Sequence, residues 1–306
     1  SKSMKKDGSV FTLENEELLI RVERHGAELT RIYDKKAGRD ILWEGDPSVW
    51  GRHAPILFPF VGKSWEGTYR HGDKTYSITP HGFARDMEFA PVLCDMDECL
   101  YRLEDTPETF EKYPFRFSLE AGYRLEGRSI EVSWRVENRG SEAMYFMIGG
   151  HPAFRVPEGK NIYDYTLVFN QEKGQGGDSL DALSYQAPDG EGFREEALAG
   201  TLALEAGTVP ITKGFFDRAL TYIFDREQVK SVGLLVDGVP YVTVSCAGFP
   251  YLGVWTMEAT HPFVCLEPWY GVCDRKGYEG ELKDRDGVVS LNGWNTWERS
   301  YTIRIE

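Results

Sequence analysis

Two short stretches of the sequence combine a titratable side chain with residues that leave space around it. His151 follows two glycines and precedes Pro152, so the backbone can turn sharply and leave the imidazole open to a ligand. Glu267 interrupts the apolar run 263–271, and burial there would raise its pKa toward the range of a general base. An imidazole acid and a carboxylate base with no evident nucleophile indicate proton-transfer chemistry.

Each of these residues also has an ordinary structural interpretation. A histidine such as His151 is more often a hydrogen-bonded residue at a strand end, and Glu267 could equally pair with a structural arginine. Aromatic residues beside a carboxylate suit a carbohydrate, because the C–H faces of a sugar lie on rings while its hydroxyls bond to charged groups. We expect most of the candidate platforms to lie in the core instead; they are Trp43, Trp65, Trp255, Trp269, Trp294 and Trp297.

Composition and motifs exclude several classes of protein. The 306 residues include 35 Lys plus Arg and 49 Asp plus Glu, and the net charge of −14 argues against nucleic acid and anionic membranes as partners. Five cysteines without a Cys-x-x-Cys pair argue against a disulfide framework and a structural zinc site. No serine-hydrolase, P-loop or zincin motif occurs, and no apolar run or leader is long enough for a membrane, so we expect a cytoplasmic protein.

Alternation of apolar and polar residues runs from end to end of the chain and predicts antiparallel strands. The clearest runs are Leu18/Ile20/Val22, Ile130/Val132/Trp134/Val136, Tyr163/Tyr165/Leu167/Phe169, Val242/Val244/Cys246 and Tyr301/Ile303/Ile305. Turns such as Asp237-Gly238 suit hairpins, and only 107–113 and 228–231 suggest short helices. We therefore predict an all-β protein, a large antiparallel sandwich in one domain that spans residues 1–306.

Two segments stand apart from this pattern. Residues 1–6 are polar, and we expect them to be frayed, with the three residues before Met4 a remnant of cloning. Residues 174–194 are rich in Gly, Asp, Ser and Gln and predict a long loop, which could be a mobile lid or a plain surface excursion.

Five separated motifs together resemble the aldose 1-epimerase family, most closely its LacX-like branch. They are His25-Gly26-Ala27-Glu28-Leu29, Ala54-Pro55-Ile56-Leu57-Phe58-Pro59-Phe60-Val61-Gly62, His81-Gly82-Phe83-Ala84-Arg85, Gly150-His151-Pro152-Ala153-Phe154 and Leu266-Glu267-Pro268-Trp269. Their order and spacing match from about Glu17 to the C-terminus. The resemblance implies a large antiparallel β-supersandwich of the galactose mutarotase type, with a sugar bound on a concave sheet face.

The resemblance also implies roles for three side chains in an isomerase that needs no cofactor. Glu267 would be the base that removes the proton from the anomeric hydroxyl, and His151 the acid that protonates the ring oxygen. His81 resembles the second histidine of the family, which hydrogen-bonds the ring-side oxygens; alternatively it anchors a loop. Ring opening, rotation about C1–C2 and closure would interconvert the α and β anomers.

The substrate is less well specified than the reaction. Arg52 and Arg85 match sugar-binding arginines of related branches, and Asp217 resembles a carboxylate that binds sugar hydroxyls. The mutarotases proper have an Asn-Arg pair near the position of Lys63, so sugar contacts there do not transfer. Because paired arginines suit a phosphate, the expected partner is a small aldohexose that is either free or phosphorylated.

Two other classes of function stay open on the sequence. A non-catalytic sugar-binding module could use the same concave face, although binding alone needs no acid and base. A glycoside-processing enzyme would need a second carboxylate beside Glu267, and only Asp217 offers one.

Overall fold

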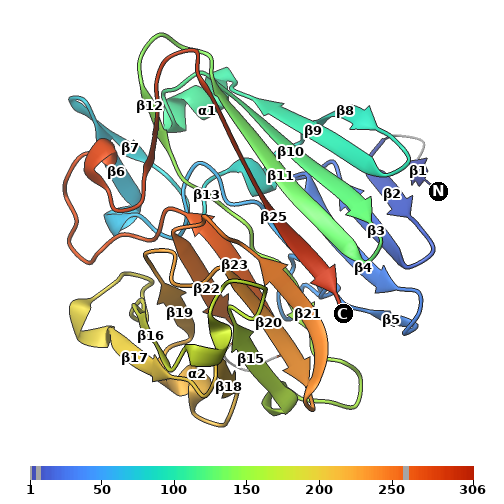
Figure 1. Ribbon diagram of the computed structural model, residues 1–306. Helices are drawn as coiled ribbons and strands as arrows, with labels where there is room; N and C mark the ends of the chain where they lie inside the picture. The colour runs from blue at the N-terminus through green and yellow to red at the C-terminus, as the bar shows by residue number, and fades with distance from the viewer. Residues whose placement is uncertain (1, 5–7, 258–261) are drawn as a thin grey trace.

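The computed structural model describes residues 2–4, 8–257 and 262–306 (Figure 1). Strands dominate the described chain, and its two α-helices are short: α1 (Pro107–Lys112) and α2 (Phe215–Arg218). Three larger antiparallel sheets and three two-stranded ones make up the architecture. The predicted all-β, antiparallel fold is therefore confirmed.

The N-terminal sheet has five strands that follow one another along the chain and lie at the right of Figure 1. They are β1 (Lys2–Met4), β2 (Val10–Glu14), β3 (Leu18–Glu23), β4 (Glu28–Asp34) and β5 (Arg39–Asp40). The expectation that residues 1–6 are frayed is wrong for Lys2–Met4, because backbone pairing with β2 makes this segment a strand. Residues 1, 5 and 6 lie outside the described residues.

The largest sheet has nine strands and crosses the middle of the molecule, with β25 beside β11 (Figure 1). In spatial order the strands are β18 (Thr208–Pro210), β15 (Tyr165–Phe169), β20 (Ser231–Val236), β21 (Val239–Ser245), β25 (Thr296–Ile305), β11 (Ser129–Asn138), β10 (Phe117–Glu126), β9 (Glu98–Glu104) and β8 (Ala90–Cys94). The predicted alternating runs near residues 130, 165, 242 and 301 all fall on strands of this sheet.

The third large sheet carries Glu267 and flanks His151, the two residues that the sequence predicts as base and acid. Its strands are β13 (Ile148–Gly149) and β14 (Ala153–Arg155), which both pair with β23 (Phe263–Tyr270), followed by β22 (Tyr251–Trp255) and β19 (Thr221–Phe224). The two-stranded sheets are β12 (Met144–Phe146) with β24 (Val289–Leu291), β16 (Ala182–Tyr185) with β17 (Gly200–Ala203), and β6 (Thr68–His71) with β7 (Lys74–Ser77).

The two predicted helices have different outcomes. Helix α1 is confirmed, since Thr106 caps its N-terminus by accepting from the backbone N–H of Thr109, and Pro107 begins it. The helix at 228–231 is wrong: Ser231 begins β20, and the Gln228 amide hydrogen-bonds Ser184 instead. Helix α2 was missed because four residues are too few to show helical periodicity.

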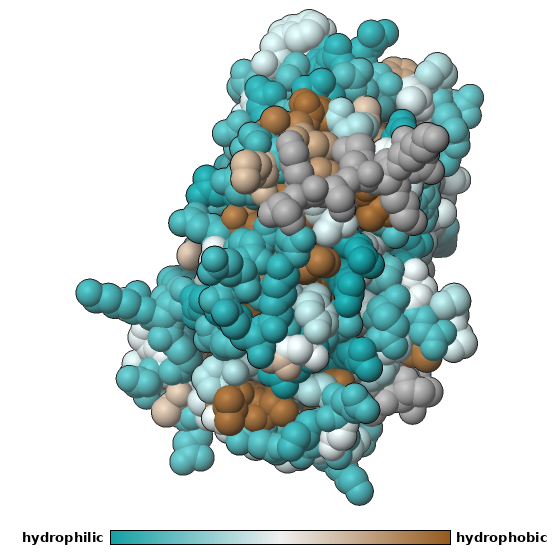
Figure 2. All heavy atoms as spheres, turned by 90° about the vertical axis from the view of Figure 1, so that its right-hand side faces the viewer, coloured by the Kyte–Doolittle hydropathy of each residue, from teal (hydrophilic) through white to brown (hydrophobic). Residues whose placement is uncertain are grey.

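The three large sheets share one apolar core. Buried apolar side chains of all three large sheets form one continuous cluster. The face shown in Figure 2 is largely hydrophilic, with its apolar atoms in small separate patches. Within the described residues, neither helix has the length and apolarity needed to cross a bilayer.

One cation joins the N-terminal sheet to the nine-stranded sheet. The Arg128 guanidinium, in the turn between β10 and β11, donates to Asp34 at the end of β4 at 2.6 and 3.2 Å. It also donates to the Ile305 carbonyl at the end of β25 at 3.0 Å. Although burial acts in the opposite direction, the contact with Arg128 holds the pKa of the Asp34 carboxyl below its usual value.

We predict that Arg128→Met lowers the free energy of unfolding by about 2 kcal/mol at neutral pH, because Asp34 loses its charged partner. A depressed pKa in the folded state stabilises the fold above the unfolded pKa, and this stabilisation is lost as pH falls through the folded pKa. Urea unfolding at neutral pH and in acid should therefore show a difference from wild type that shrinks in acid. Arg124→Met, which removes an exposed pair with Glu126, is the matched control and should change little.

Candidate active site

The register of the third sheet places His151 directly across from Glu267. The pairing is the same on both sides of the break between β13 and β14: Gly149 faces Trp269 and Ala153 faces Cys265. His151 lies in that break, and its Nε2 is 3.2 Å from Oε1 of Glu267. Both side chains are buried, with 7% and 2% of their surfaces exposed. Strand pairing therefore brings together the two residues that the sequence predicts as acid and base.

A second histidine, His81, packs against His151 from a tight turn. His81 has a φ of +63°, and its ring packs edge-on against His151 with the centroids 5.6 Å apart. The backbone N–H of Gly62 donates to His81 Nδ1 at 2.8 Å, so the neutral ring carries its proton on Nε2. Gly82 follows at φ +72°, where a Cβ would overlap the carbonyl of Phe58.

One short segment holds both histidine turns in place. Leu57 bonds to Gly149 in both directions, at 2.9 and 3.0 Å, which fixes the strand before His151. The next carbonyl, that of Phe58, accepts the N–H of Phe83 at 3.0 Å, which fixes the turn after His81. The two histidine motifs are 70 residues apart in sequence. They lie close together because Leu57 pairs with one motif and the next residue, Phe58, pairs with the other.

These residues surround a cavity of about 260 Å³. Glu267, Trp269 and Trp255 form part of its floor from β23 and β22, and both histidines line it. Two tryptophans cover the His151 ring: Trp50 stacks on it at 5.2 Å and Trp255 meets it edge-on at 5.3 Å. The cavity thus combines apolar ring faces with a few polar groups, as small-molecule sites do.

Burial sets the protonation of the acid and base. Desolvation raises the pKa of Glu267 well above its usual value, and the neighbouring Trp269 acts in the opposite direction. Desolvation also lowers the pKa of His151 to about 3, and the charges of Arg85 and Arg52 act in the same direction. The favoured state is therefore an uncharged pair, with a neutral imidazole beside a protonated carboxyl.

The two predicted arginines have different positions. Arg85 lines the cavity; its Nη2 donates to the Pro80 carbonyl at 3.0 Å, and its buried Nε has no partner among the described residues. Burial lowers the pKa of Arg85 to about 10. Arg52 is held outside the lining by Asp86, at 2.9 Å. Of these two arginines, Arg85 is therefore the one that presents unused donor capacity to the cavity.

The structure does not bring Asp217 to the cavity lining. Phe215 and Phe216 of α2 pack inward, which leaves the Asp217 carboxylate exposed on the opposite side of this short helix. Its predicted role in binding sugar hydroxyls has no support from this placement.

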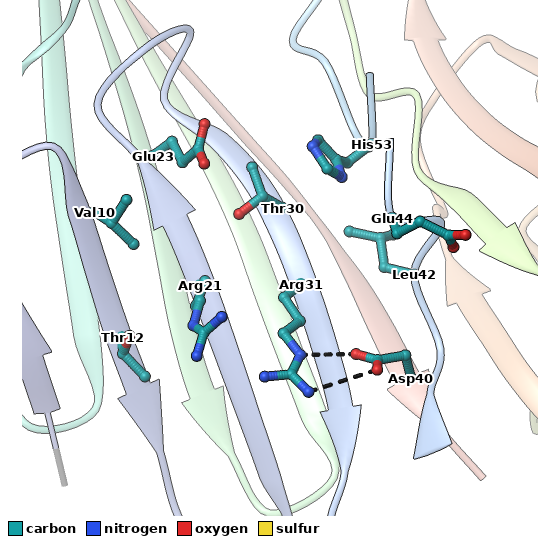
Figure 3. A pocket seen from close by; sticks show the side chains of 10 residues that line it. All are labelled: Val10, Thr12, Arg21, Glu23, Thr30, Arg31, Asp40, Leu42, Glu44 and His53. Atoms are coloured by element: carbon teal, nitrogen blue, oxygen red, sulfur yellow. Dashed lines mark hydrogen bonds and ion pairs between the residues drawn. The ribbon is translucent and has the colours of Figure 1, made fainter. Parts of the chain in front are cut away.

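A larger hollow lies on the outer face of the N-terminal sheet (Figure 3). It measures about 610 Å³, and Figure 3 shows Arg31 paired with Asp40 at its wall. Its charged side chains are partly or fully exposed, so water screens them and no acid and base are desolvated together there. The smaller cavity beside Glu267 is therefore the better candidate for catalysis.

Comparison with known proteins agrees with the geometry. A family model described as Aldose 1-epimerase matches residues 9–192. Two forms of Protein LacX from Lactococcus lactis subsp. lactis, chromosomal and plasmid, are each 31% identical over 311 residues, which is 96% of this chain and 98% of the relative. The chain belongs to the aldose 1-epimerase family.

Solved structures confirm the family fold. A galactose mutarotase related enzyme from Lactobacillus acidophilus superposes with a TM-score of 0.88 at 27% identity, over 97% of both chains. A galactose mutarotase-like protein from Lactobacillus casei gives 0.86 at 28% identity, over 97% of this chain and 100% of that one. The predicted β-supersandwich of the galactose mutarotase type is confirmed.

Sequence reasoning missed several residues that line this cavity. Trp50 was not among the candidate platforms, although it precedes Arg52 by only two residues. Pro188 and Gly192, near the end of the segment 174–194, also line the cavity. That segment includes β16, and Lys63 at the cavity edge donates to the Glu191 carbonyl at 2.8 Å. Whether the segment moves as a lid stays a prediction.

One cluster beside the cavity has the atom types of a metal centre. Ligand-type atoms of His151, Cys265 and Glu267 lie within 4.8 Å of one another, and all three residues are buried. Burial raises the pKa of the Cys265 thiol well above its usual value, which keeps it protonated, and His151 already contacts Glu267. These features favour proton transfer over metal binding at this position.

We predict that Trp50→Ala raises the pKa of His151 from about 3 toward the ordinary ~6.5, because water reaches the ring when its stacked cover is removed. The Cε1 proton of His151, identified by its loss in His151→Gln, should report this shift in an NMR titration. Trp294→Ala is the control, since Trp294 is 69% exposed, and it should leave the titration unchanged. An unchanged titration in Trp50→Ala would contradict burial as the cause.

Proposed function

We propose that this protein is an aldose 1-epimerase that interconverts the α and β anomers of an aldohexose. The observation that carries the proposal is the contact of 3.2 Å between His151 Nε2 and Glu267 Oε1 inside a cavity. The two oxygens that exchange protons in ring opening, O1 and the ring oxygen, are both bonded to C1. An acid and a base that act on both must therefore lie side by side.

The proposed reaction starts when the Glu267 carboxylate removes the proton of the O1 hydroxyl. The bond between C1 and the ring oxygen breaks, and His151 gives that oxygen its proton, so an open-chain aldehyde forms. After rotation about C1–C2, the same steps in reverse close the ring on the other face of the carbonyl. His81 supports the ring-side oxygens through its Nε2–H, which the bond from Gly62 to Nδ1 leaves available.

This mechanism uses one proton for the pair throughout. In the resting site the proton lies on Glu267, and in the reactive form it lies on His151, so the two forms differ only by a transfer across their contact. The rate should therefore be constant over a broad range around neutral pH. It should fall in acid, where the pair gains a second proton, and in alkali, where it loses its only one.

The cavity favours an epimerase over a glycoside-processing enzyme. A volume of about 260 Å³ lies near the lower end for ligand pockets, ~300 Å³, which suits one sugar ring. Retaining glycosidases place a second carboxylate ~5–5.5 Å from the first, and here Asp217 is outside the lining. The partner of Glu267 is an imidazole, which matches proton exchange at one carbon.

A phosphorylated aldohexose is a second candidate substrate. Arg85 lines the cavity. Among the described residues, its buried Nε has no hydrogen-bond partner and no carboxylate forms an ion pair with its guanidinium. Burying such a charge is unfavourable unless a bound group neutralises it.

We predict that Glu267→Gln lowers kcat/KM for anomer exchange by ~10²–10⁴-fold, since the amide cannot accept the O1 proton. The fold should be preserved because Gln has the shape of the protonated carboxyl that burial already favours. NMR exchange between the anomers of glucose, galactose and glucose 6-phosphate measures the effect above the spontaneous rate.

The matched control is Glu120→Gln, which changes a buried glutamate of β10 that pairs with Arg102 and Arg135 away from the cavity. It should cost stability and leave turnover per folded molecule unchanged. Full activity in Glu267→Gln would sink the assignment of the base. No acceleration of any sugar by the wild type would instead favour a binding module.

We predict that Arg85→Gln raises KM for glucose 6-phosphate at least ~tenfold more than for glucose, because a charge-assisted bond to phosphate is lost. Arg52→Gln is the comparison, since Asp86 already neutralises Arg52 outside the lining, and its effect should not discriminate between the two sugars. An equal change of KM for both sugars in Arg85→Gln would argue against a phosphate contact.

A further inference from the structure

The indole of Trp269 lies across the strand that carries the proposed base. A Cβ at Gly149, directly opposite on β13, would overlap Cδ1 of the indole. A Cβ at Gly253, on β22, would come within 2.6 Å of Cη2 and Cζ2. Because Gly253 is the register partner of Glu267, the ring reaches from one neighbouring strand to the other beside the carboxylate. Two glycines thus make the space that fixes this ring.

The edge of the ring that faces the two glycines is the one that carries the N–H. The nearest atoms to Gly149 are Cδ1, Cγ and Nε1, and the nearest to Gly253 are Cη2, Cζ2 and Cε2. Glu267 and Trp269 are two residues apart on β23, so their side chains share one face of the sheet. The Nε1 atom is buried and has no hydrogen-bond partner among the described residues. The indole is nevertheless close enough for hydrogen bonding to lower the pKa of Glu267, so the donor lies beside the carboxyl without a well-formed bond to it.

We propose that Trp269 is a positioning residue for the general base: its ring holds the Glu267 carboxyl against His151, and its indole N–H donates to the carboxylate when the proton has moved to His151. The inference deepens the proposed epimerase function and rests on Glu267 as its base. In the resting pair Glu267 is uncharged and needs no further donor. In the reactive form its charge is buried, and a donor at that moment favours the form that can accept the O1 proton.

Of the other described groups that face Glu267, Tyr301 also offers a strong donor, and it comes from the nine-stranded sheet rather than from β23. His151 is the partner in the proton transfer, and the Cys265 thiol is a weak donor. Tyr301 of β25 interacts with Glu267, and burial keeps its hydroxyl protonated by raising its pKa. Arg52 and Arg85 act on His151 rather than on the carboxyl. Trp269 is the group on the same strand whose presence lowers the pKa of Glu267.

The first experiment compares Trp269→Phe with Trp255→Phe in anomer-exchange kinetics as a function of pH. Loss of the N–H makes the Glu267 carboxylate less favourable, so kcat on the neutral plateau should fall ~tenfold, and the alkaline limb should move up by about one pH unit. Trp255→Phe also removes a cavity indole, but it should leave the alkaline limb in place. A merely structural role for Trp269 would lower activity without moving that limb.

A second measurement does not depend on turnover. The indole N–H resonance of Trp269, identified by its loss in Trp269→Phe, should shift in ¹⁵N-edited NMR as pH rises through the titration of Glu267. The shift should be absent in Glu267→Gln, which keeps the ring but cannot ionise. A resonance that does not titrate, or that titrates equally in Glu267→Gln, would overturn the inference. Titration of this resonance in a protein with no epimerase activity would establish the bond between Trp269 and Glu267 but reject the proposed function.

Discussion

The structure depends on placing a carboxyl and an imidazole together in a region from which water is excluded. An isolated charge on either group would cost several kcal/mol in such surroundings. One proton shared between Glu267 and His151 removes both charges, because the carboxyl is then protonated and the imidazole neutral. The sheet can therefore bury the pair without an ion-pair partner for either. The same arrangement keeps the charge-separated form within one proton transfer, which is the form that ring opening needs.

This constraint explains why the third sheet departs from regular pairing where it does. Residues 148–155 do not form one continuous strand. Gly150 and Pro152 interrupt it around His151, so that β13 ends at Gly149 and β14 begins at Ala153. The ladder bonds on either side persist, from Gly150 to the Pro268 carbonyl and from Leu266 to the Pro152 carbonyl. The break thus frees the histidine while the register that aims it at Glu267 is preserved. Local irregularity at a functional position is the expected exception to a consistent fold.

Local pattern predicted much of this, and long-range packing set the rest. Alternation in residues 130–136 and 301–305 predicted strands because their side chains face a core on one side and solvent on the other. Glu267 and His151 were recognisable because glycine, proline and aromatic neighbours are unusual around a titratable group. Trp50 was not, since its role depends on stacking over a residue 101 positions later, which no local period encodes.

The failure to place Asp217 in the cavity has a related cause. The short stretch Phe215–Arg218 shows a carboxylate beside two aromatic residues, which resembles the setting of Glu267. On a strand, alternate side chains share a face, but on a helical turn the inward direction goes to Phe215 and Phe216, and Asp217 faces solvent. Composition was the same kind of signal in both stretches, and backbone conformation decided which carboxyl was buried.

The nearby arginines bear on the protonation of His151. The charges of Arg85 and Arg52 add to burial in opposing this protonation, although the proposed reaction needs His151 as an acid. A substrate whose negative group met Arg85 would cancel part of that field and make protonation of the imidazole easier. Substrate binding and formation of the reactive pair would then be coupled, because the cation that meets such a substrate also adds to the effect of burial in keeping His151 neutral. A free sugar would leave that opposition in place, so the reactive form would depend more on the donors around Glu267.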